Sequence, residues 1–299
     1  MATQREVKTR IASFKNIQKI TRAMEAVSAA RLRRAEQRIA ALRPYADAIR
    51  RMTRQAAIDA GAEVSRLPLL QLHEPEQRVG LLLVTADRGL AGAFNSQIIR
   101  TGLRLGAEIE ADGRTVVWYA SGRRGVSSLT FRGKPLAGSY VGFTDRPTYA
   151  DARGIAGDLM AAYIEGGVDR VEIIYNGYIS PLTQRVTREV LLPLAEATIM
   201  GQDTAEDEER EGARPLVEYE PEAEEILRVL IPDYVETSLH RALLESTASE
   251  HGARMTAMRS ASENAGDLIE DLALEMNRAR QAEITQEIME VVAGAESLV

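Results

Sequence analysis

Two long segments at opposite ends of this 299-residue chain carry the apolar spacing of coiled-coil helices. From Thr3 to Ala60 there is no glycine and a single proline, Pro44. Apolar residues there follow alternating steps of three and four, which is the a/d spacing of a helical seam: Leu32, Ala35, Ile39, Leu42, Ala46 and Ile49. At 1.5 Å per residue the segment predicts a helix of about 80 Å. We expect Pro44 to kink or interrupt it, because proline removes one backbone hydrogen bond.

The C-terminal segment repeats this pattern after Pro232, the last proline of the chain. Steps of four and three continue through a series rich in small residues and Met: His251, Met255, Met258, Ser262, Ala265, Ile269, Leu272, Met276 and Ala279. Each helix has only a narrow apolar stripe, so neither is stable alone in water. We therefore predict that shaft helices at 1–60 and 233–299 pair as an antiparallel coiled coil.

Between these helices the sequence changes to short runs of β-branched residues, separated by stretches compatible with helices. The runs at 79–85, 115–120 and 168–175 predict strands, and the stretches at 95–111 and 149–165 predict helices. The run at 185–192 predicts a further strand or a continuation into the next segment. This alternation predicts a small inserted α/β domain at 75–200, Rossmann-like with a largely parallel sheet. Residues 201–232 are acidic and polar, and we expect a surface loop or linker there.

Charge is divided unevenly along the chain, although the formal net charge is only −7. Residues 1–60 carry 14 Lys and Arg against 5 Asp and Glu, whereas 200–232 and 233–299 each have a net charge of −8. The two ends therefore attract either each other or external partners. A basic helix alone would suit nucleic acid, but the overall acidity and the lack of interleaved aromatic residues argue against that partner.

Residue types needed for several kinds of chemistry are missing. The chain has no cysteine, which excludes disulfides and thiolate metal sites. Of its three histidines, His240 and His251 lie about 16 Å apart along the predicted helix, too far to share a metal. No P-loop and no G-x-S-x-G nucleophile motif occurs. We therefore expect no catalytic residues, no cofactor and no metal site.

The segment TADRGLAGAFN at 85–95 is the best candidate for a ligand site, because it follows a predicted strand and precedes a predicted helix. Its glycines, Gly89 and Gly92, do not form the G-x-G-x-x-G fingerprint of dinucleotide sites. We favour a structural turn that Asp87 caps and in which Arg88 makes an ion pair or contact. The competing hypothesis is a nucleotide- or phosphate-binding α/β enzyme with a coiled-coil arm.

Four blocks together resemble one protein family over essentially the whole chain. The block ITQEIMEVVAGAES at 284–297 is similar to the signature of the γ subunit of the F-type ATP synthase. Residues 15–35 resemble the N-terminal shaft of that family, and residues 85–95 resemble its central turn. Residues 239–265, together with 277–285, resemble its C-terminal shaft. The resemblance implies a non-catalytic rotor that couples proton translocation through the membrane c-ring to ATP synthesis or hydrolysis in the αβ ring. It also implies a role in regulating ATPase activity and proton flow.

The resemblance further implies partners: the α and β subunits with one γ per αβ hexamer, the ε subunit and the c-ring. Partner-contact residues are expected on three elements. They are Arg22 and Met24 on the N-terminal helix, Asp87 and Arg88 in the central turn, and Arg278, Arg280 and Gln281 on the C-terminal helix. In the family's pattern, Met24 falls where the helix meets a lever of β, although seam packing explains Met24 equally well. Arg280 and Gln281 fall where the other helix meets a catch loop of β.

The N-terminus has no apolar core of a signal peptide, and no stretch of about 18 apolar residues could span a membrane. Together with the resemblance, this predicts a peripheral protein on the cytoplasmic side of a bacterial cell membrane, in contact with the membrane only through its partners.

Overall fold

The computed structural model describes residues 4–61, 67–194 and 222–296. Its contacts divide the chain into two units, residues 31–253 and the paired segments 1–30 and 254–299. Long helices occupy both ends of the chain, with the α/β elements between them in sequence. The order is α1 (Gln4–Ala60), β1 (Arg78–Val84), α2 (Phe94–Ala111), β2 (Thr115–Ser121), α3 (Arg123–Phe131), β3 (Leu136–Tyr140), α4 (Tyr149–Ile164), β4 (Arg170–Tyr178), β5 (Gln184–Leu192) and α7 (Ala223–Glu296).

The unit at 31–253 is built on one five-stranded sheet with the order β3-β2-β1-β4-β5. Strand β1 pairs in parallel with β2 and β4, and β2 pairs in parallel with β3. Only the edge strand β5 runs antiparallel, against β4. The predicted α/β class and its largely parallel sheet are confirmed.

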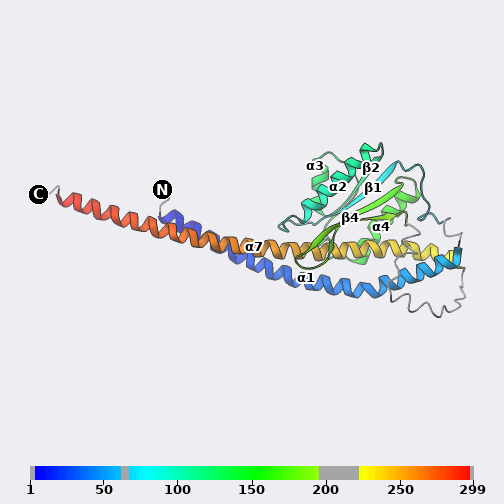
Figure 1. Ribbon diagram of the computed structural model, residues 1–299, viewed down its shortest axis with the longest axis horizontal. Helices are drawn as coiled ribbons and strands as arrows, with labels where there is room; N and C mark the ends of the chain where they lie inside the picture. Colours follow the sequence, from blue (N-terminus) through cyan, green and yellow to red (C-terminus); the bar gives the residue numbers. More distant parts are fainter. Residues whose placement is uncertain (1–3, 62–66, 195–221, 297–299) are drawn as a thin grey trace. The chain divides into compact units, whose positions relative to one another are not determined.

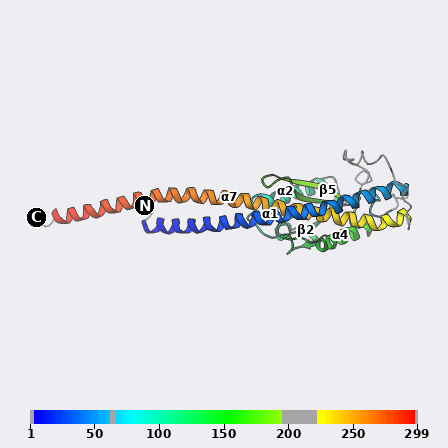
Figure 2. The same ribbon diagram turned by 90° about the horizontal axis from the view of Figure 1, so that it is seen from below.

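Both faces of this sheet are covered, as a buried parallel sheet requires. Alternate residues of β1 point to opposite faces: Leu82 and Val84 join a core with α4 and with the α1 and α7 segments of this unit. Leu81 and Leu83 join a second core with α2 and α3. Figures 1 and 2 both show α1 and α7 running side by side within this unit.

The unit made of 1–30 and 254–299 consists of the first part of α1 and the last part of α7. Its seam buries small and apolar side chains from both helices, among them Val7 and Ile11 of α1 and Ala265 of α7. No described helix contains an apolar stretch long enough to cross a membrane.

The structure bears on both expectations about proline. Helix α1 runs unbroken through Pro44, so the expected interruption is wrong, whereas a kink there stays a prediction. Helix α7 begins at Ala223 and contains Pro232, so the predicted start after that proline is also wrong. The reason is packing: Leu227 and Ile231, on the N-terminal side of Pro232, are buried in the core. Burial of such side chains contributes about 2 kcal/mol each, so the two together offset the roughly 3 kcal/mol that proline costs a helix.

Two elements were not expected, the short helix α3 and the five-residue strand β3. Of the loop or linker predicted at 201–232, residues 201–221 lie outside the described residues, whereas 223–232 form the start of α7, so the predicted end of the loop is wrong.

Candidate functional site

Asp87 joins three loops at the carboxyl edge of the sheet. Its carboxylate accepts hydrogen bonds from the backbone N–H of Arg123 at 3.0 Å and of Gly142 at 2.9 Å. It also accepts from the backbone N–H of Thr144 at 3.3 Å and from the hydroxyl of Thr144 at 3.0 Å. Arg123 begins α3, and the other two donors follow β3. One side chain after β1 therefore fixes the segments that follow β2 and β3.

Thr85 also accepts a hydrogen bond from a backbone amide at the start of α3. The hydroxyl of Thr85 accepts from the N–H of Gly125 at 2.8 Å and lies 2.9 Å from the carbonyl of Ser121. Amides at a helix start are where a phosphate would bind. Here they donate to the chain's own Asp87 and Thr85, which supports a structural turn over the competing nucleotide- or phosphate-binding hypothesis.

The turn also depends on a glycine at the start of α3. Gly122 has φ +90°, and a Cβ built on it would lie 2.1 Å from the carbonyl oxygen of Thr85. The backbone of Thr85 is therefore too close to Gly122 for any residue with a side chain at that position. Arg88, by contrast, is exposed and its side chain makes no ion pair with any described residue. The contact that the turn does show for Arg88 is at its backbone, where the carbonyl accepts from the Asn95 side chain at 3.4 Å.

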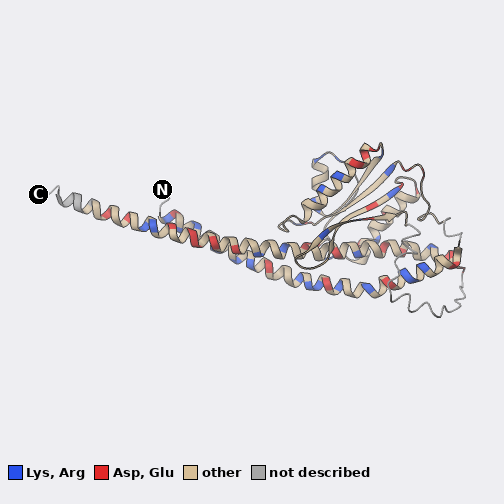
Figure 3. Ribbon diagram, in the orientation of Figure 1, with Lys and Arg blue, Asp and Glu red and all other residues tan. Residues whose placement is uncertain are grey.

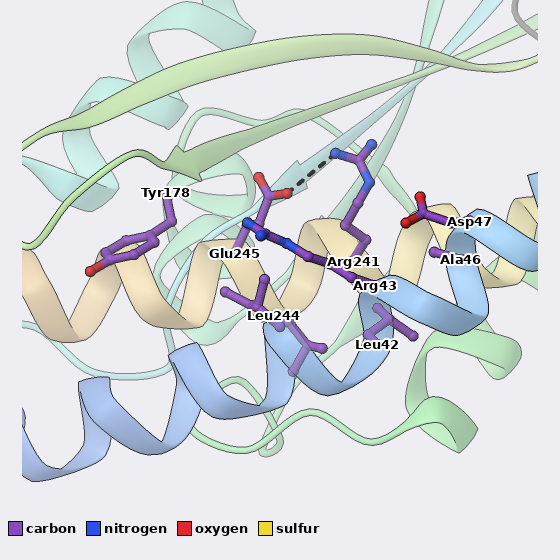
Figure 4. Close-up of a pocket in the computed structure, with 9 residues that line it drawn as sticks. Leu42, Arg43, Ala46, Asp47, Tyr178, Arg241, Leu244 and Glu245 are labelled. Carbon is purple, nitrogen blue, oxygen red and sulfur yellow. Dashed lines mark hydrogen bonds and ion pairs between the residues drawn. The ribbon is translucent and has the colours of Figure 1, made fainter. Parts of the chain in front are cut away.

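A second polar cluster links the sheet to α7. Arg241 of α7 donates to Glu189 of β5 at 2.8 Å and to Glu245, one turn further along α7, at 3.3 Å. The Tyr175 hydroxyl of β4 donates to Glu189 at 2.7 Å. Beside this cluster, α1, α7 and Tyr178 line a cavity of about 150 Å³ (Figure 4).

The charges of this cluster depend on one another. Burial raises the pKa of the Glu245 carboxyl, and the adjacent Arg241 cation offsets part of that rise. Burial also disfavours the charged form of Arg241, but its acidic neighbours outweigh this effect and raise the pKa of the guanidinium. Arg241 therefore stays protonated and holds β5 against α7.

The other predicted contact residues all lie in the unit formed by 1–30 and 254–299. Arg22 is exposed on α1 and Met24 is half-buried. Arg278, Arg280 and Gln281 are exposed on α7, where partner residues can reach them. Asp87 and Arg88 belong to the other unit.

A model of the ATP synthase family matches residues 3–298. The ATP synthase gamma chain of Streptomyces avermitilis is 44% identical over 302 aligned residues, which cover 99% of this chain and 96% of that relative. The gamma chain of Rubrobacter xylanophilus is also 44% identical, covering 100% of this chain and 99% of the relative. The chain belongs to the ATP synthase γ-chain family. It is therefore a non-catalytic rotor subunit.

Solved structures agree with this assignment to the γ-chain family. A chain of the Tetrahymena thermophila mitochondrial ATP synthase central stalk and c-ring is 26% identical, with a TM-score of 0.59 over 81% of this chain and 99% of that one. A chain of the Euglena gracilis mitochondrial ATP synthase rotor has a TM-score of 0.65, covering 94% of this chain and 98% of that one. At 17% identity, this second likeness bears on the fold alone.

Sequence reasoning missed the Arg241 cluster of this γ-chain family member. The sequence does indicate part of this cluster: Arg241 and Glu245 are four residues apart on a predicted helix, so they share a face and can pair. The partner Glu189 is 52 residues away in sequence and becomes a neighbour only when β5 packs beside α7.

Proposed function

We propose that this γ chain carries rotation between a membrane c-ring and a hexamer of α and β subunits, with one γ chain per hexamer. Proton flow turns the ring and the shaft to drive ATP synthesis, and ATP hydrolysis turns them in reverse to pump protons. The observation that carries this proposal is the family match across 3–298 in a chain whose ends form helices of 57 and 74 residues.

In this proposal α1 and α7 act as one antiparallel coiled coil. Within the unit of 1–30 and 254–299, the Gln18 amide donates to the carbonyl of Ser262 at 3.2 Å, and Arg259 pairs with Glu25 at 2.9 Å. Residue numbers thus rise along α1 while they fall along α7, which supports antiparallel pairing. Two helices that share a seam resist twisting better than one, and a shaft needs that stiffness.

The unit at 31–253 supports the same pairing independently. Leu42 of α1 and Leu244 of α7 line one cavity, and Ala56 of α1 shares a buried core with Leu230 of α7. We assign the α/β domain at 75–200 to the contact with the c-ring and the ε subunit. The Arg241 cluster would then pass torque from the sheet into α7.

The exposed residues of α7 are assigned to the contact with a β subunit. Arg280 presents a guanidinium that can bind a carboxylate through two parallel hydrogen bonds, and Gln281 adds an amide beside it. Arg278, Arg22, Met24, Asp87 and Arg88 complete the proposed contact set.

Arg280→Ala is expected to lower the ATPase rate of the assembled complex about tenfold, because losing a charge-assisted contact of about 1.5 kcal/mol from the rate-limiting barrier costs about that factor. The fold of the chain should be unaffected, since Arg280 is exposed. Arg104→Ala is the matched control: Arg104 is an exposed arginine of α2, its side chain 73% exposed, and it is not among the residues assigned to the contact with a β subunit. Steady-state ATPase assays on purified complexes measure both variants. Equal rates for Arg280→Ala and the control would remove Arg280 from the contact.

Reconstitution tests the partners. One copy of the chain should co-purify with each hexamer of cognate α and β subunits and should stimulate ATP turnover. A chain that neither joins the hexamer nor changes its turnover would contradict the proposal.

We also place the chain at the bacterial cell membrane, on its cytoplasmic side, held there only through its partners. It should leave washed membranes together with the α and β subunits, and never ahead of them.

A further inference from the structure

A basic cavity lies in the unit at 31–253, between α1 and the loop that follows β3. It has a volume of about 200 Å³. Four arginines line it, Arg31, Arg34, Arg38 and Arg146, together with Asp145 and His251. The three arginines of α1 are spaced three and four residues apart and so share one face of the helix. Figure 3 shows how frequent basic residues are along α1.

Only part of this positive charge is neutralised within the chain. Arg31 is paired with Asp145, and the Nε2 atom of His251 lies 3.6 Å from the same carboxylate. Among the described residues, Arg34, Arg38 and Arg146 have no carboxylate partner within 4.0 Å. Of the four guanidinium groups that line the cavity, only that of Arg31 is therefore paired with a carboxylate.

The charge and the size of the cavity together define what it can hold. Guanidinium groups around one cavity repel each other, and an anion among them removes that repulsion. A volume of about 200 Å³ is several times the ~30 Å³ of a water molecule but below the roughly 300–1,000 Å³ of pockets for drug-sized ligands. The space suits a small polyatomic anion and is too small to enclose a whole nucleotide.

We propose that this cavity binds a small oxyanion of the phosphate class. Arg34 and Arg38 hold it from α1, and Arg146 holds it from the loop after β3, through charge-assisted hydrogen bonds. The Arg31–Asp145 pair forms the wall of the site. A bound anion would tie α1 to that loop and stabilise this unit. The proposal does not depend on the rotor function.

The test is calorimetric titration of the purified full-length chain with inorganic phosphate, in chloride buffer at constant ionic strength. We expect saturable binding. Arg34→Gln combined with Arg38→Gln should weaken binding at least about tenfold, since each removes a charge-assisted bond. Arg33→Gln is the matched control, because Arg33 is an exposed neighbour on α1 that does not line the cavity, and binding should change less than about twofold.

Further titrations distinguish free phosphate from a nucleotide and from an acidic protein partner as the ligand of this cavity. ATP should bind no more tightly than inorganic triphosphate, which carries the same phosphates without base or ribose; ATP that binds more tightly than triphosphate would overturn the assignment to a small anion. A pentaglutamate peptide that binds where phosphate does not would also overturn it, in favour of an interface with an acidic partner.

Circular dichroism of each variant shows whether its helices are retained. If the double variant unfolds, Arg146→Gln on the loop takes its place, with an expected loss of about tenfold for the one bond that it removes. Phosphate that binds no better than chloride, or a control variant that loses as much affinity as the cavity variants, would overturn the proposal.

Discussion

Gly122→Ala is expected to destabilise the unit at 31–253 by about 3 kcal/mol or more. The new Cβ would lie 2.1 Å from the carbonyl oxygen of Thr85, a backbone atom that cannot swing aside as a flexible side chain would. The backbone of Thr85 is itself held by a hydrogen bond from its N–H to the carbonyl of Ser121 at 2.8 Å. Strain at φ +90° costs about 1–3 kcal/mol, and overpacking adds a similar amount.

The chain supplies a matched control for this substitution. Gly113 has φ +80°, but a Cβ there would meet no atom within 4 Å, so Gly113→Ala should cost only about 1 kcal/mol of backbone strain. Urea unfolding followed by tryptophan fluorescence measures both variants. Trp118 is the single tryptophan of the chain and is buried in the sheet, so its signal reports on this unit. Equal losses in the two variants would show that the contact with Thr85 is not the cause.

Asp87→Ala should have the second-largest effect, a loss of about 3 kcal/mol from the free energy of unfolding of the same unit. The substitution removes the acceptor of four hydrogen bonds, three of them from backbone amides. Bonds to a charged group contribute about 1.5–3 kcal/mol each, but bonds that share one acceptor do not add in full. Asp87→Asn, which keeps one acceptor oxygen, should lose about half as much.

Arg88→Ala separates stability from partner contact at this turn. Arg88 is exposed and unpaired among the described residues, so its removal should change the free energy of unfolding by less than about 0.5 kcal/mol. The fluorescence of Trp118 again measures the variants. Asp87→Ala with a stability equal to that of Arg88→Ala would contradict the role given to the carboxylate.

Much of the fold follows from periodicity in the sequence. The a/d spacing predicts both terminal helices, and the β-branched runs predict four of the five strands. Strand β3 was missed because its sequence, LAGSY, contains one large apolar residue and no alternation. The true start of α7 was missed because Pro232 suggests a boundary, and only the tertiary burial of Leu227 shows that the helix continues through it.

The candidate site was predictable only where its interactions are local. A turn capped by Asp87 follows from the residue type. Its donors, however, lie 36 to 57 residues away and become neighbours only when β1, β2 and β3 align. The contacts proposed for Arg280 and Gln281 came through resemblance, because an exposed residue on a long helix gives no signal of its partner.

The most direct test of the rotor function is to watch this chain turn. Because the chain has no cysteine, Arg104→Cys on the exposed surface of α2 creates a unique attachment point for a gold particle. A complex with cognate α and β subunits, fixed to glass through the hexamer, is then supplied with ATP and followed by light microscopy. We predict continuous rotation of the particle in one direction that stops when ATP is withdrawn. A complex that hydrolyses ATP while the particle stays still would contradict the account.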